Sequence, residues 1–397
     1  MGPNSRDSLA NSRLPRLTFV LAVFAACGGG AARREPLADA DDPWPMFRRE
    51  PRHGGDARDH RALAWEVAWQ VELGERVDAS PIVVEHGVVV ATREGTVALL
   101  DPVIGAERAR TSLGGGIWAT PAAARGVIVL GVGRRRGGEL VGLSARDLRV
   151  RWRRTITAAR GTRASTFGAA TADGDSVWLC AGESVVAVRV RDGAEVARHD
   201  VRARCFGAPA IDGEKIYVAT RNGEVIALDR DLLRDGAPEP VRWIAPTTRA
   251  FADTSPVVND ELVLVGSNDG HLYALATQDG APRWKVGDGH WVVSAPAIAD
   301  GLAIFGDDGD VVRAVTLADG SERWRGEVGG DVASSAVVVG EHVVHGAHDG
   351  KVHAWQLADG AALPPMDAGA AMFASPALTA SGLLVIATHE GRVLAIR

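Results

Sequence analysis

Four histidines near the C-terminus are the residues whose type and crowding could bind a metal: His342, His345, His348 and His353. A zinc site needs imidazoles that converge on one point. His342 and His345 stand three residues apart on a predicted strand and therefore point to opposite sides. A turn at Asp349-Gly350 also places His345 and His353 on opposite faces. We therefore predict no metal site at this hairpin.

The sequence holds no pattern typical of nucleophilic catalysis. No Ser/His/Asp or Cys/His arrangement has a supporting spacing, and we predict neither a catalytic residue nor a cofactor. The chain has three cysteines, Cys27, Cys180 and Cys205. In an oxidising compartment Cys180 and Cys205 could pair. The sequence leaves two alternatives open for them, a disulfide or two buried thiols.

The N-terminus has the pattern of an export signal. Residues 1–16 carry three arginines, and residues 17–26 form an apolar run of ten. This run is shorter than the roughly 20 residues of a membrane-spanning helix and is typical of a signal peptide. The sequence FAAC at residues 24–27, followed by Gly28, resembles a bacterial lipobox, with Phe24 where Leu is usual. The resemblance implies a lipid on Cys27 and, because no Asp follows it, an outer-membrane destination. The alternative is ordinary cleavage with Cys27 unmodified.

Composition and charge exclude one class of partner. The 397 residues are 46% hydrophobic and 24% charged, with a net charge of −6. Removal of residues 1–26 takes away three arginines and one aspartate and leaves −8. A mildly acidic protein is a poor candidate for sequence-independent nucleic-acid binding. We predict no nucleic-acid partner.

A repeat of about forty residues dominates the rest of the chain. Ser255-Pro256, for example, is followed by LVLVGSNDGHLYAL and TQDGAPRW, and Ala295-Pro296 opens the next unit in the same way. Each unit indicates four strands joined by Asp-Gly turns, as in a propeller blade. We predict an all-β, eight-bladed β-propeller. Eight residues mark the repeat position: Pro81, Pro121, Ala169, Pro209, Pro256, Pro296, Ala336 and Pro376.

The two ends of the repeat region predict how the ring closes. The last unit, 375–397, has three strands and stops. Residues 69–74 match the fourth strand that contains Trp284, and they precede the first unit. Since an open ring would leave sheet edges unpaired, we expect this N-terminal strand to complete the last blade.

Tryptophan recurs in the predicted fourth strands. This periodicity favours packing between blades over a role in aromatic binding sites. The residues are Trp69, Trp152, Trp243, Trp284 and Trp324.

The repeat resembles that of the pyrroloquinoline-quinone (PQQ) propeller family. The S-P-A-V opening, the A-x₄-G-x₃-W ending and the eightfold count carry this resemblance over residues 65–397. One branch of the family contains PQQ-dependent dehydrogenases, which use two adjacent cysteines and metal-binding carboxylates. The other contains BamB-like outer-membrane lipoproteins without a cofactor. This chain has no Cys-Cys pair and resembles the second branch. We divide it into a signal peptide (1–26), a tether (27–43), a leader (44–64) and a propeller (65–397).

Aromatic and charged residues gather in the segments that lead into the predicted first strands. These segments share one rim of a propeller, and such groups suit protein recognition. The alternative is that the aromatics fill the centre of the ring. Phe167, Met372 and Asp331 belong to the same segments. The predicted partner-binding residues are Trp118, Arg204, Phe206, Arg249, Phe251, Asp253, His290, Trp291 and Phe373.

Two of these loops extend the resemblance to BamB-like proteins. Arg204 and Asp253 stand where the equivalent loops carry an Arg and acidic residues that contact the assembly barrel. Phe251 stands where a second acidic residue is expected. The leader, with Trp44–Arg48 and His53–Gly55, resembles one found ahead of other PQQ-like repeat proteins. It is not expected in BamB itself, which leaves open a paralogue with another partner.

The leading hypothesis is a monomeric, non-catalytic propeller anchored by a lipid on the periplasmic side of the outer membrane. It would bind a protein, for instance the outer-membrane β-barrel assembly machinery, through the rim or by strand addition at an outer blade edge. A PQQ-dependent oxidoreductase and a carbohydrate- or ligand-binding propeller remain alternatives, because one fold hosts all three functions.

Overall fold

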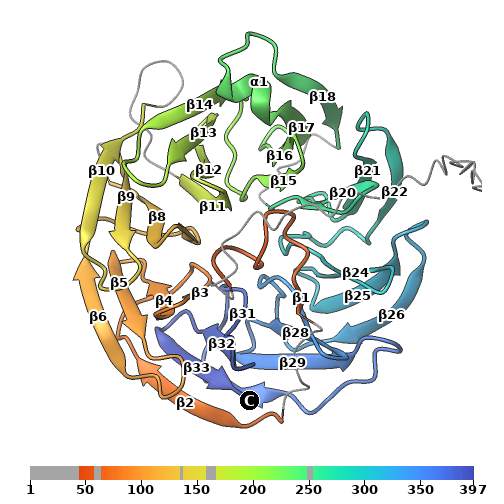
Figure 1. Cartoon of the computed structure of the whole chain (residues 1–397). Helices are drawn as coiled ribbons and strands as arrows, with labels where there is room; N and C mark the ends of the chain where they lie inside the picture. Colours follow the sequence, from red (N-terminus) through yellow and green to blue (C-terminus); the bar gives the residue numbers. More distant parts are fainter. Residues whose placement is uncertain (1–43, 58–63, 135–136, 158–166, 248–253) are drawn as a thin grey trace, which may run out of the picture. The chain divides into compact units, whose positions relative to one another are not determined.

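The computed structural model describes residues 44–57, 64–134, 137–157, 167–247 and 254–397. These residues form eight β-sheets, arranged as blades around a common axis (Figure 1). The predicted eight-bladed propeller is therefore confirmed. Cys27, the signal peptide and the tether lie outside the described residues. Within the described ranges, no helix combines the length and the hydropathy needed to cross a bilayer.

The first four blades follow one another along the chain, each with its strands in sequence order from the axis outward. Blade 1 has β3 (Ile82–Val84), β4 (Gly87–Ala91), β5 (Thr96–Leu100) and β6 (Glu107–Ser112). Blade 2 has β7 (Ala122–Ala124), β8 (Val127–Val132), β9 (Glu139–Ser144) and β10 (Val150–Thr155). Blade 3 has β11 (Phe167–Asp173), β12 (Ser176–Ala181), β13 (Ser184–Arg189) and β14 (Glu195–Asp200). Blade 4 has β15 (Ala210–Asp212), β16 (Lys215–Ala219), β17 (Glu224–Asp229) and β18 (Val241–Pro246), with helix α1 (Arg230–Arg234) between the last two.

The remaining blades bring in two strands from the N-terminal part of the chain. Blade 5 has β19 (Val257–Val258), β20 (Leu262–Gly266), β21 (Leu272–Ala276) and β22 (Pro282–Val286). Blade 6 has β23 (Ala297–Ala299), β24 (Leu302–Gly306), β25 (Val311–Thr316) and β26 (Glu322–Glu327). Blade 7 has β27 (Val337–Val339), β28 (His342–Gly346), β29 (Lys351–Gln356) and β30 (Met366–Asp367), plus β1 (Asp56–Ala57) parallel to β27. Blade 8 has β31 (Ala377–Leu378), β32 (Leu384–Ala387), β33 (Arg392–Ile396) and β2 (Val67–Glu72).

The ring closes as predicted. Strand β2 pairs antiparallel with β33, with Gln70 opposite Leu394, so the N-terminal strand completes the last blade. Strand position decides burial. The second and third strands lie between neighbouring blades and are fully buried in blade 1. The fourth strand has one side in solvent, and in β10 only Trp152 is buried.

The fourth-strand tryptophans join adjacent blades. Each indole N–H donates to a backbone carbonyl of the next blade, as a packing role predicts. A turn glycine packs on the indole: a Cβ on Gly280, whose φ is +74°, would lie 2.6 Å from the Trp243 ring. Glycine tolerates this φ and leaves room for the ring. The five bonds are Trp69 to Pro102 (3.2 Å), Trp152 to Val190 (2.7 Å), Trp243 to Thr277 (3.2 Å), Trp284 to Leu317 (2.9 Å) and Trp324 to Leu357 (2.9 Å).

Hydroxyl groups before the repeat proline position form a second set of joints. Each accepts a hydrogen bond from the backbone N–H at the same position of the preceding blade, which explains the S-P opening of the repeat. One of them, Ser80, links blade 8 to blade 1. The pairs are Ser80 N to Thr120 (3.1 Å), Ala208 N to Ser255 (2.8 Å), Ala295 N to Ser335 (3.0 Å), Ser335 N to Ser375 (2.9 Å) and Ser375 N to Ser80 (2.9 Å).

The joint between blades 3 and 4 is held differently. Ala197 replaces the tryptophan in β14, and α1 replaces the glycine turn of the next blade. Here Cys180 of β12 and Cys205, in the loop that leads into β15, form a disulfide with Cα atoms 5.6 Å apart. Of the two alternatives for these cysteines, the structure has the disulfide, and it links the two blades covalently.

Candidate partner-binding rim

Two kinds of segment form one face of the ring, here called the rim: the loop that leads into each first strand and the turn that follows each second strand. They lie together because the first two strands of a blade are antiparallel. In blade 2, Gly116 of the leading loop and Gly133 of the turn exchange two backbone hydrogen bonds, of 3.0 and 2.8 Å. In blade 2, the entry loop and the turn after the second strand are therefore joined at the rim.

Three of the predicted rim aromatics are solvent-exposed. Trp118 is 45% exposed, Trp291 52% and Phe373 40%. Phe206 is half-buried, with the Arg221 guanidinium carbon 4.4 Å from its ring centroid. Because their faces reach solvent, Trp118, Trp291 and Phe373 are available for contact with a partner.

Other residues of the predicted rim lie elsewhere. Phe167 and Met372 are buried and pack against Gly131 and Gly346 of the second strands. They are therefore packed in the core between blades, as the alternative of interior aromatics and apolar residues allows. Arg204 is exposed beside Phe206. Three predicted residues lie outside the described residues: Arg249, Phe251 and Asp253.

Phe373 is the centre of a cluster that spans blades 7, 8 and 1. Its ring centroid lies 4.3 Å from that of His348 and 5.0 Å from that of His389. His348 Nδ1 is 3.2 Å from Asp331 Oδ2, and His389 Nδ1 is 2.8 Å from Asp78 Oδ1. The aromatic ring is thus supported by two imidazoles whose orientation two carboxylates set.

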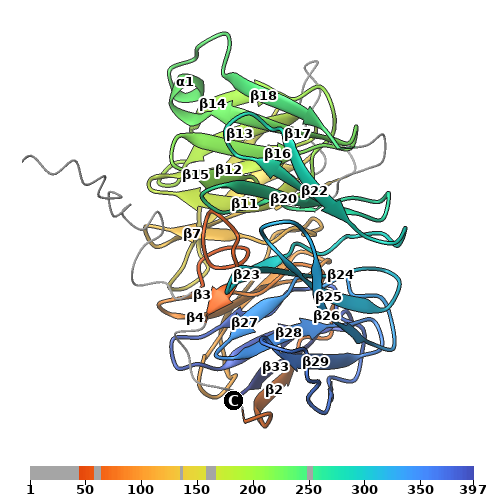
Figure 2. The same ribbon diagram turned by 90° about the vertical axis from the view of Figure 1, so that its right-hand side faces the viewer.

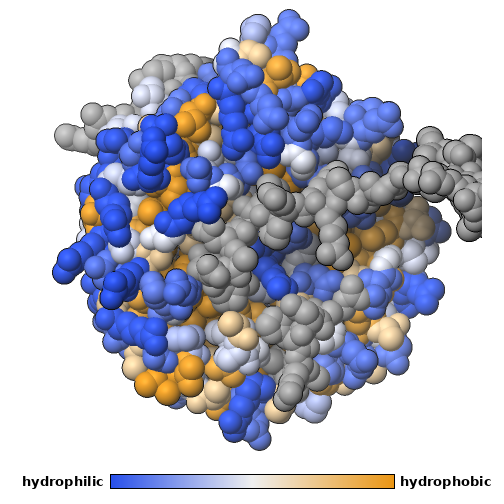
Figure 3. All heavy atoms as spheres, in the orientation of Figure 1, coloured by the Kyte–Doolittle hydropathy of each residue, from blue (hydrophilic) through white to orange (hydrophobic). Residues whose placement is uncertain are grey.

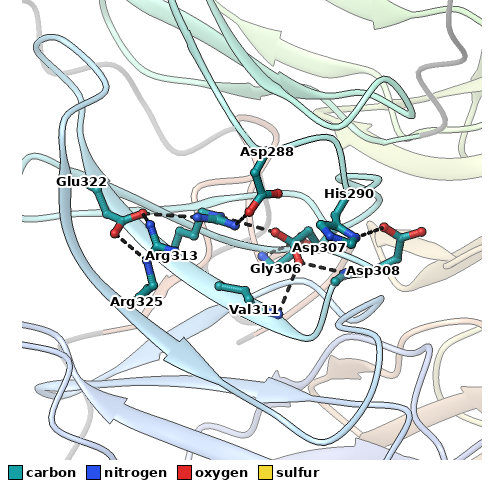
Figure 4. Close-up of polar contacts among 11 residues, drawn as sticks. Asp288, His290, Gly306, Asp307, Asp308, Val311, Arg313, Glu322 and Arg325 are labelled. Carbon is teal, nitrogen blue, oxygen red and sulfur yellow. Dashed lines mark hydrogen bonds and ion pairs between the residues drawn. The ribbon is translucent and has the colours of Figure 1, made fainter.

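A second cluster surrounds His290 on the loop that leads into blade 6 (Figure 4); Trp291 is the next residue of this loop. His290 Nδ1 lies 3.8 Å from Asp308 Oδ1, and the Trp291 carbonyl accepts the Asp308 N–H at 3.0 Å. The His290 ring packs on Gly309, where a Cβ would come within 2.4 Å. Contacts between the entry loop and the turn of blade 6 therefore fix the backbone that carries the exposed Trp291.

Buried charges connect this cluster to the body of blade 6. Arg313 of β25 is buried and reaches Asp307 at 3.4 Å, Glu322 at 3.3 Å and Asp288, which comes from the preceding loop. Burial raises the pKa of Asp307. The network ties the rim loop of blade 6 to its third and fourth strands, as Figure 4 shows.

Rim charges are paired within the chain. Asp78 lies 3.2 Å from Arg93 as well as beside His389, and Asp308 and Asp331 each face an imidazole. Among the described residues, no three His, Cys, Asp or Glu side chains are grouped to hold a metal. The described rim does not fit the metal-binding carboxylate set of a quinone site. It offers aromatic faces beside carboxylates that lie close to histidine and arginine side chains.

One expectation about the histidine hairpin is wrong. His345 and His353 are direct cross-strand partners, so they share a face of the sheet and both pack on Trp355, at 6.2 and 5.9 Å between centroids. The turn is longer than Asp349-Gly350, since Ala347 N–H donates to the Lys351 carbonyl. This lengthening shifts the register by one residue and changes the face. His345 Nδ1 contacts the Ser334 carbonyl at 3.2 Å and His353 Nε2 contacts Asp349 at 2.9 Å.

Sequence reasoning missed the turn residues of the rim. Four of them stand two residues after the end of a second strand: Arg93, Arg221, His348 and His389. A signal existed: aligned repeats place these positions at the same end of the blade as the entry loops. The residue type there varies from blade to blade, so the repeat itself did not mark them.

The fold and the rim define a class: an eight-bladed propeller of PQQ-type repeats with aromatic groups on one face. The chain belongs to the family described as "Outer membrane protein assembly factor BamB", whose family model matches residues 57–236 and 240–397. A comparison of the sequence with curated proteins found no match.

Solved structures show the same fold at low identity. BamB from Moraxella catarrhalis is 18% identical, with 85% of this chain and 100% of that chain covered and a TM-score of 0.69. Quinohemoprotein alcohol dehydrogenase from Comamonas testosteroni is 13% identical, with 91% and 81% covered and a TM-score of 0.77. The europium-containing methanol dehydrogenase is also 13% identical, with 89% and 90% covered and a TM-score of 0.71. These likenesses show the fold alone.

Proposed function

We propose that this protein is a non-catalytic, lipid-anchored propeller that binds a protein partner through its rim during outer-membrane protein assembly. The observation that carries the proposal is the BamB family match over residues 57–236 and 240–397. Three exposed aromatics on one face support protein binding, because aromatic side chains dominate the binding energy of interfaces.

The proposed location outside the cytoplasm has two supports. The Cys180–Cys205 disulfide is typical of an oxidising compartment. The signal-like residues 17–26 and the lipobox-like sequence ending at Cys27 favour export and lipid attachment.

Labelling cells with a radioactive fatty acid tests the lipid anchor: we expect label on the wild-type chain and none on a Cys27→Ser variant. Label on both, or on neither, would contradict it.

Affinity purification from envelope extracts tests the partner. The wild-type chain and a Trp118→Ala/Phe373→Ala variant serve as baits, and a variant at an exposed site outside the rim, Ile104→Ala, serves as the matched control. We expect specific proteins with wild type and the control, and fewer with the rim variant. If the three baits retain the same proteins, or none above background, the rim is not the binding surface.

A rival proposal is a PQQ-dependent oxidoreductase, because one fold can host several functions and an alcohol dehydrogenase shares this fold. In that case the purified chain would bind PQQ with Ca²⁺ and oxidise alcohols with a dye as acceptor. We expect instead that the absorption spectrum after mixing and dialysis equals that of the protein alone. A retained quinone chromophore would favour the enzyme.

A further inference from the structure

Residues 44–57, the described part of the leader, cross the centre of the ring (Figure 1). They lie on the face opposite the rim, toward the left in Figure 2. The first strands of blades 1, 2, 4, 5, 6 and 7 contact this segment. On this leader face, the visible surface outside the grey atoms is mostly polar, with apolar residues in separate patches (Figure 3). The leader segment thus occupies the end of the ring that the rim does not.

Backbone carbonyls of the leader segment accept hydrogen bonds from the first strands of six blades. In each blade the donor is the second residue after the repeat proline position. These N–H groups lie on the inner edge of the sheet and would otherwise lack a partner within it. The bonds are Val83 to Trp44 (2.7 Å), Ala123 to Pro45 (2.7 Å), Ile211 to Pro51 (2.8 Å), Val258 to Arg52 (3.0 Å), Ile298 to Gly54 (3.0 Å) and Val338 to Gly55 (3.0 Å).

Arg48 anchors the segment from within. Its side chain is 1% exposed and donates to the carbonyls of His53 (2.8 Å), Gly54 (3.0 Å) and Ala295 of blade 6 (2.9 Å). Burial lowers the pKa of Arg48 to about 9, so it is still a cation at neutral pH. A Cβ on Gly55 would lie 1.9 Å from Nη2, so the His-Gly-Gly sequence is shaped around the guanidinium.

The His53 side chain contacts blade 3, which makes none of these six backbone bonds, and blade 5, which makes one of them. Its Nε2 lies 3.1 Å from Thr171 Oγ1 of blade 3, and its Nδ1 lies 3.0 Å from the Pro256 carbonyl of blade 5. The segment holds Arg48, Arg49 and His53 at φ of 57°, 73° and 61°, a region that costs non-glycine residues energy. The surrounding contacts must therefore outweigh this strain.

We propose that the inner edges of the first strands form a peptide-binding site, and that residues 44–57 are its intramolecular ligand. The site recognises an extended segment with a buried Trp at its start, an Arg whose guanidinium binds carbonyls, and a His-Gly-Gly turn. The bound segment crosses this end of the ring. This assignment is independent of the proposed function.

Cleavage of the intact chain tests the proposal. A protease site is placed within residues 58–63, between the leader segment and β2, and the purified full chain is cut. We expect the N-terminal fragment to co-elute with the ring in gel filtration. The amides of the six donor residues should stay protected from hydrogen exchange. Loss of the fragment on the column, from a ring that keeps its circular dichroism spectrum, would overturn the proposal.

A matched pair of variants tests whether Arg48 holds the leader segment in its site. Arg48→Ala in the cleaved protein should speed fragment release at least tenfold. Arg52→Ala, which removes partly exposed ion pairs with Asp212 and Asp260, should change it less than threefold, because such ion pairs contribute little. If Arg48→Ala does not fold, a peptide-exchange experiment replaces this comparison. A labelled synthetic 44–57 peptide should then replace the fragment bound to the cleaved wild-type ring. Equal release from both variants, or no peptide uptake at any concentration, would contradict the proposed site.

Discussion

At the residue scale, the rim owes its chemistry to side chains that sit beside one another only after folding. Phe373 lies between His348 and His389, whose imidazoles come from the turns of two different blades. The repeat marks Phe373 as part of an entry loop but marks neither histidine. The exposed face of Phe373 is available for contact with a partner.

Loss of the Phe373 side chain should weaken partner binding without unfolding the propeller. Phe373→Ala removes an exposed aromatic anchor, which costs about 1–2 kcal/mol at typical interfaces, or roughly tenfold in affinity. Surface plasmon resonance with a partner recovered by affinity purification measures the change. The control is Val103→Ala, an exposed apolar residue on an outer turn. Equal affinity of both variants would remove Phe373 from the interface.

Two buried histidines should make the protein sensitive to acid. Burial lowers the pKa of His53 to about 4 and that of His345 to about 3, against about 6.5 in the unfolded chain. Below pH 6.5 the unfolded state binds protons that the folded state does not. Stability is therefore fully present above pH 6.5 and falls as the pH falls toward 4, by about 1.4 kcal/mol per pH unit for each histidine.

Denaturant unfolding at pH 7, 6 and 5 measures this slope. His345→Gln keeps a donor for the Ser334 carbonyl and removes the titrating group, so we expect a shallower loss of stability between pH 6.5 and 5. His86→Gln, at an exposed position, should leave the slope as in wild type. A His345→Gln slope equal to that of wild type would show that protonation of His345 is not what destabilises the fold.

At the element scale, the joints between blades use interchangeable devices. Trp152 packs over Gly193 where both residues are present. In β6 Ala109 replaces the tryptophan, and the matching turn position holds Leu148 at φ 57°, buried in the same cluster. The side chain that fills the joint thus comes from one blade or from the other. Between blades 3 and 4 the disulfide supplies the link.

Removal of the disulfide should weaken the joint between blades 3 and 4. It closes a loop of 25 residues, which corresponds to at most about 3.5 kcal/mol from the unfolded-chain entropy. We expect a Cys180→Ala/Cys205→Ala variant to unfold at lower denaturant concentration than wild type. A thiol reductant should bring wild type to the same midpoint and leave the variant unchanged. No effect of the reductant on wild type would show that the bond contributes no stability.

Sequence reasoning reached the elements that repeat and missed those that do not. Blade count, strand order and the role of β2 follow from a period that every unit shares. The path of the leader could not be predicted, because its partners are distant in sequence: Ala295, which Arg48 contacts, lies 247 residues away. The faces of His345 and His353 depended on a turn one residue longer than its Asp-Gly signal suggests. Local propensity does not encode such register shifts.

At the scale of the whole propeller, blade 8 differs from the other seven blades in the connectivity of its strands. Blades 1 to 7 each draw their four outward strands from a continuous stretch of chain, whereas blade 8 combines β31–β33 with β2. Non-covalent contacts attach β2 to its neighbours, among them its ladder with β33, the bond from Trp69 to the Pro102 carbonyl and the ion pair between Arg392 and Glu72. The closure should therefore be the place where the ring opens first.

A comparison of two equivalent tryptophans tests this. Trp69 and Trp324 are both 7% exposed, and each donates to the next blade, so Trp→Ala should cost about 3–5 kcal/mol at either site. In Trp324→Ala the strands of blade 6 stay connected by short turns, and we expect faster hydrogen exchange only around blades 6 and 7. In Trp69→Ala, β2 should detach and leave β33 as an open edge. Amides of residues 392–396 would then exchange faster, measured by mass spectrometry of peptic fragments. Equal protection of β33 in the two variants would mean that the ring has no weakest joint and unfolds as a single unit.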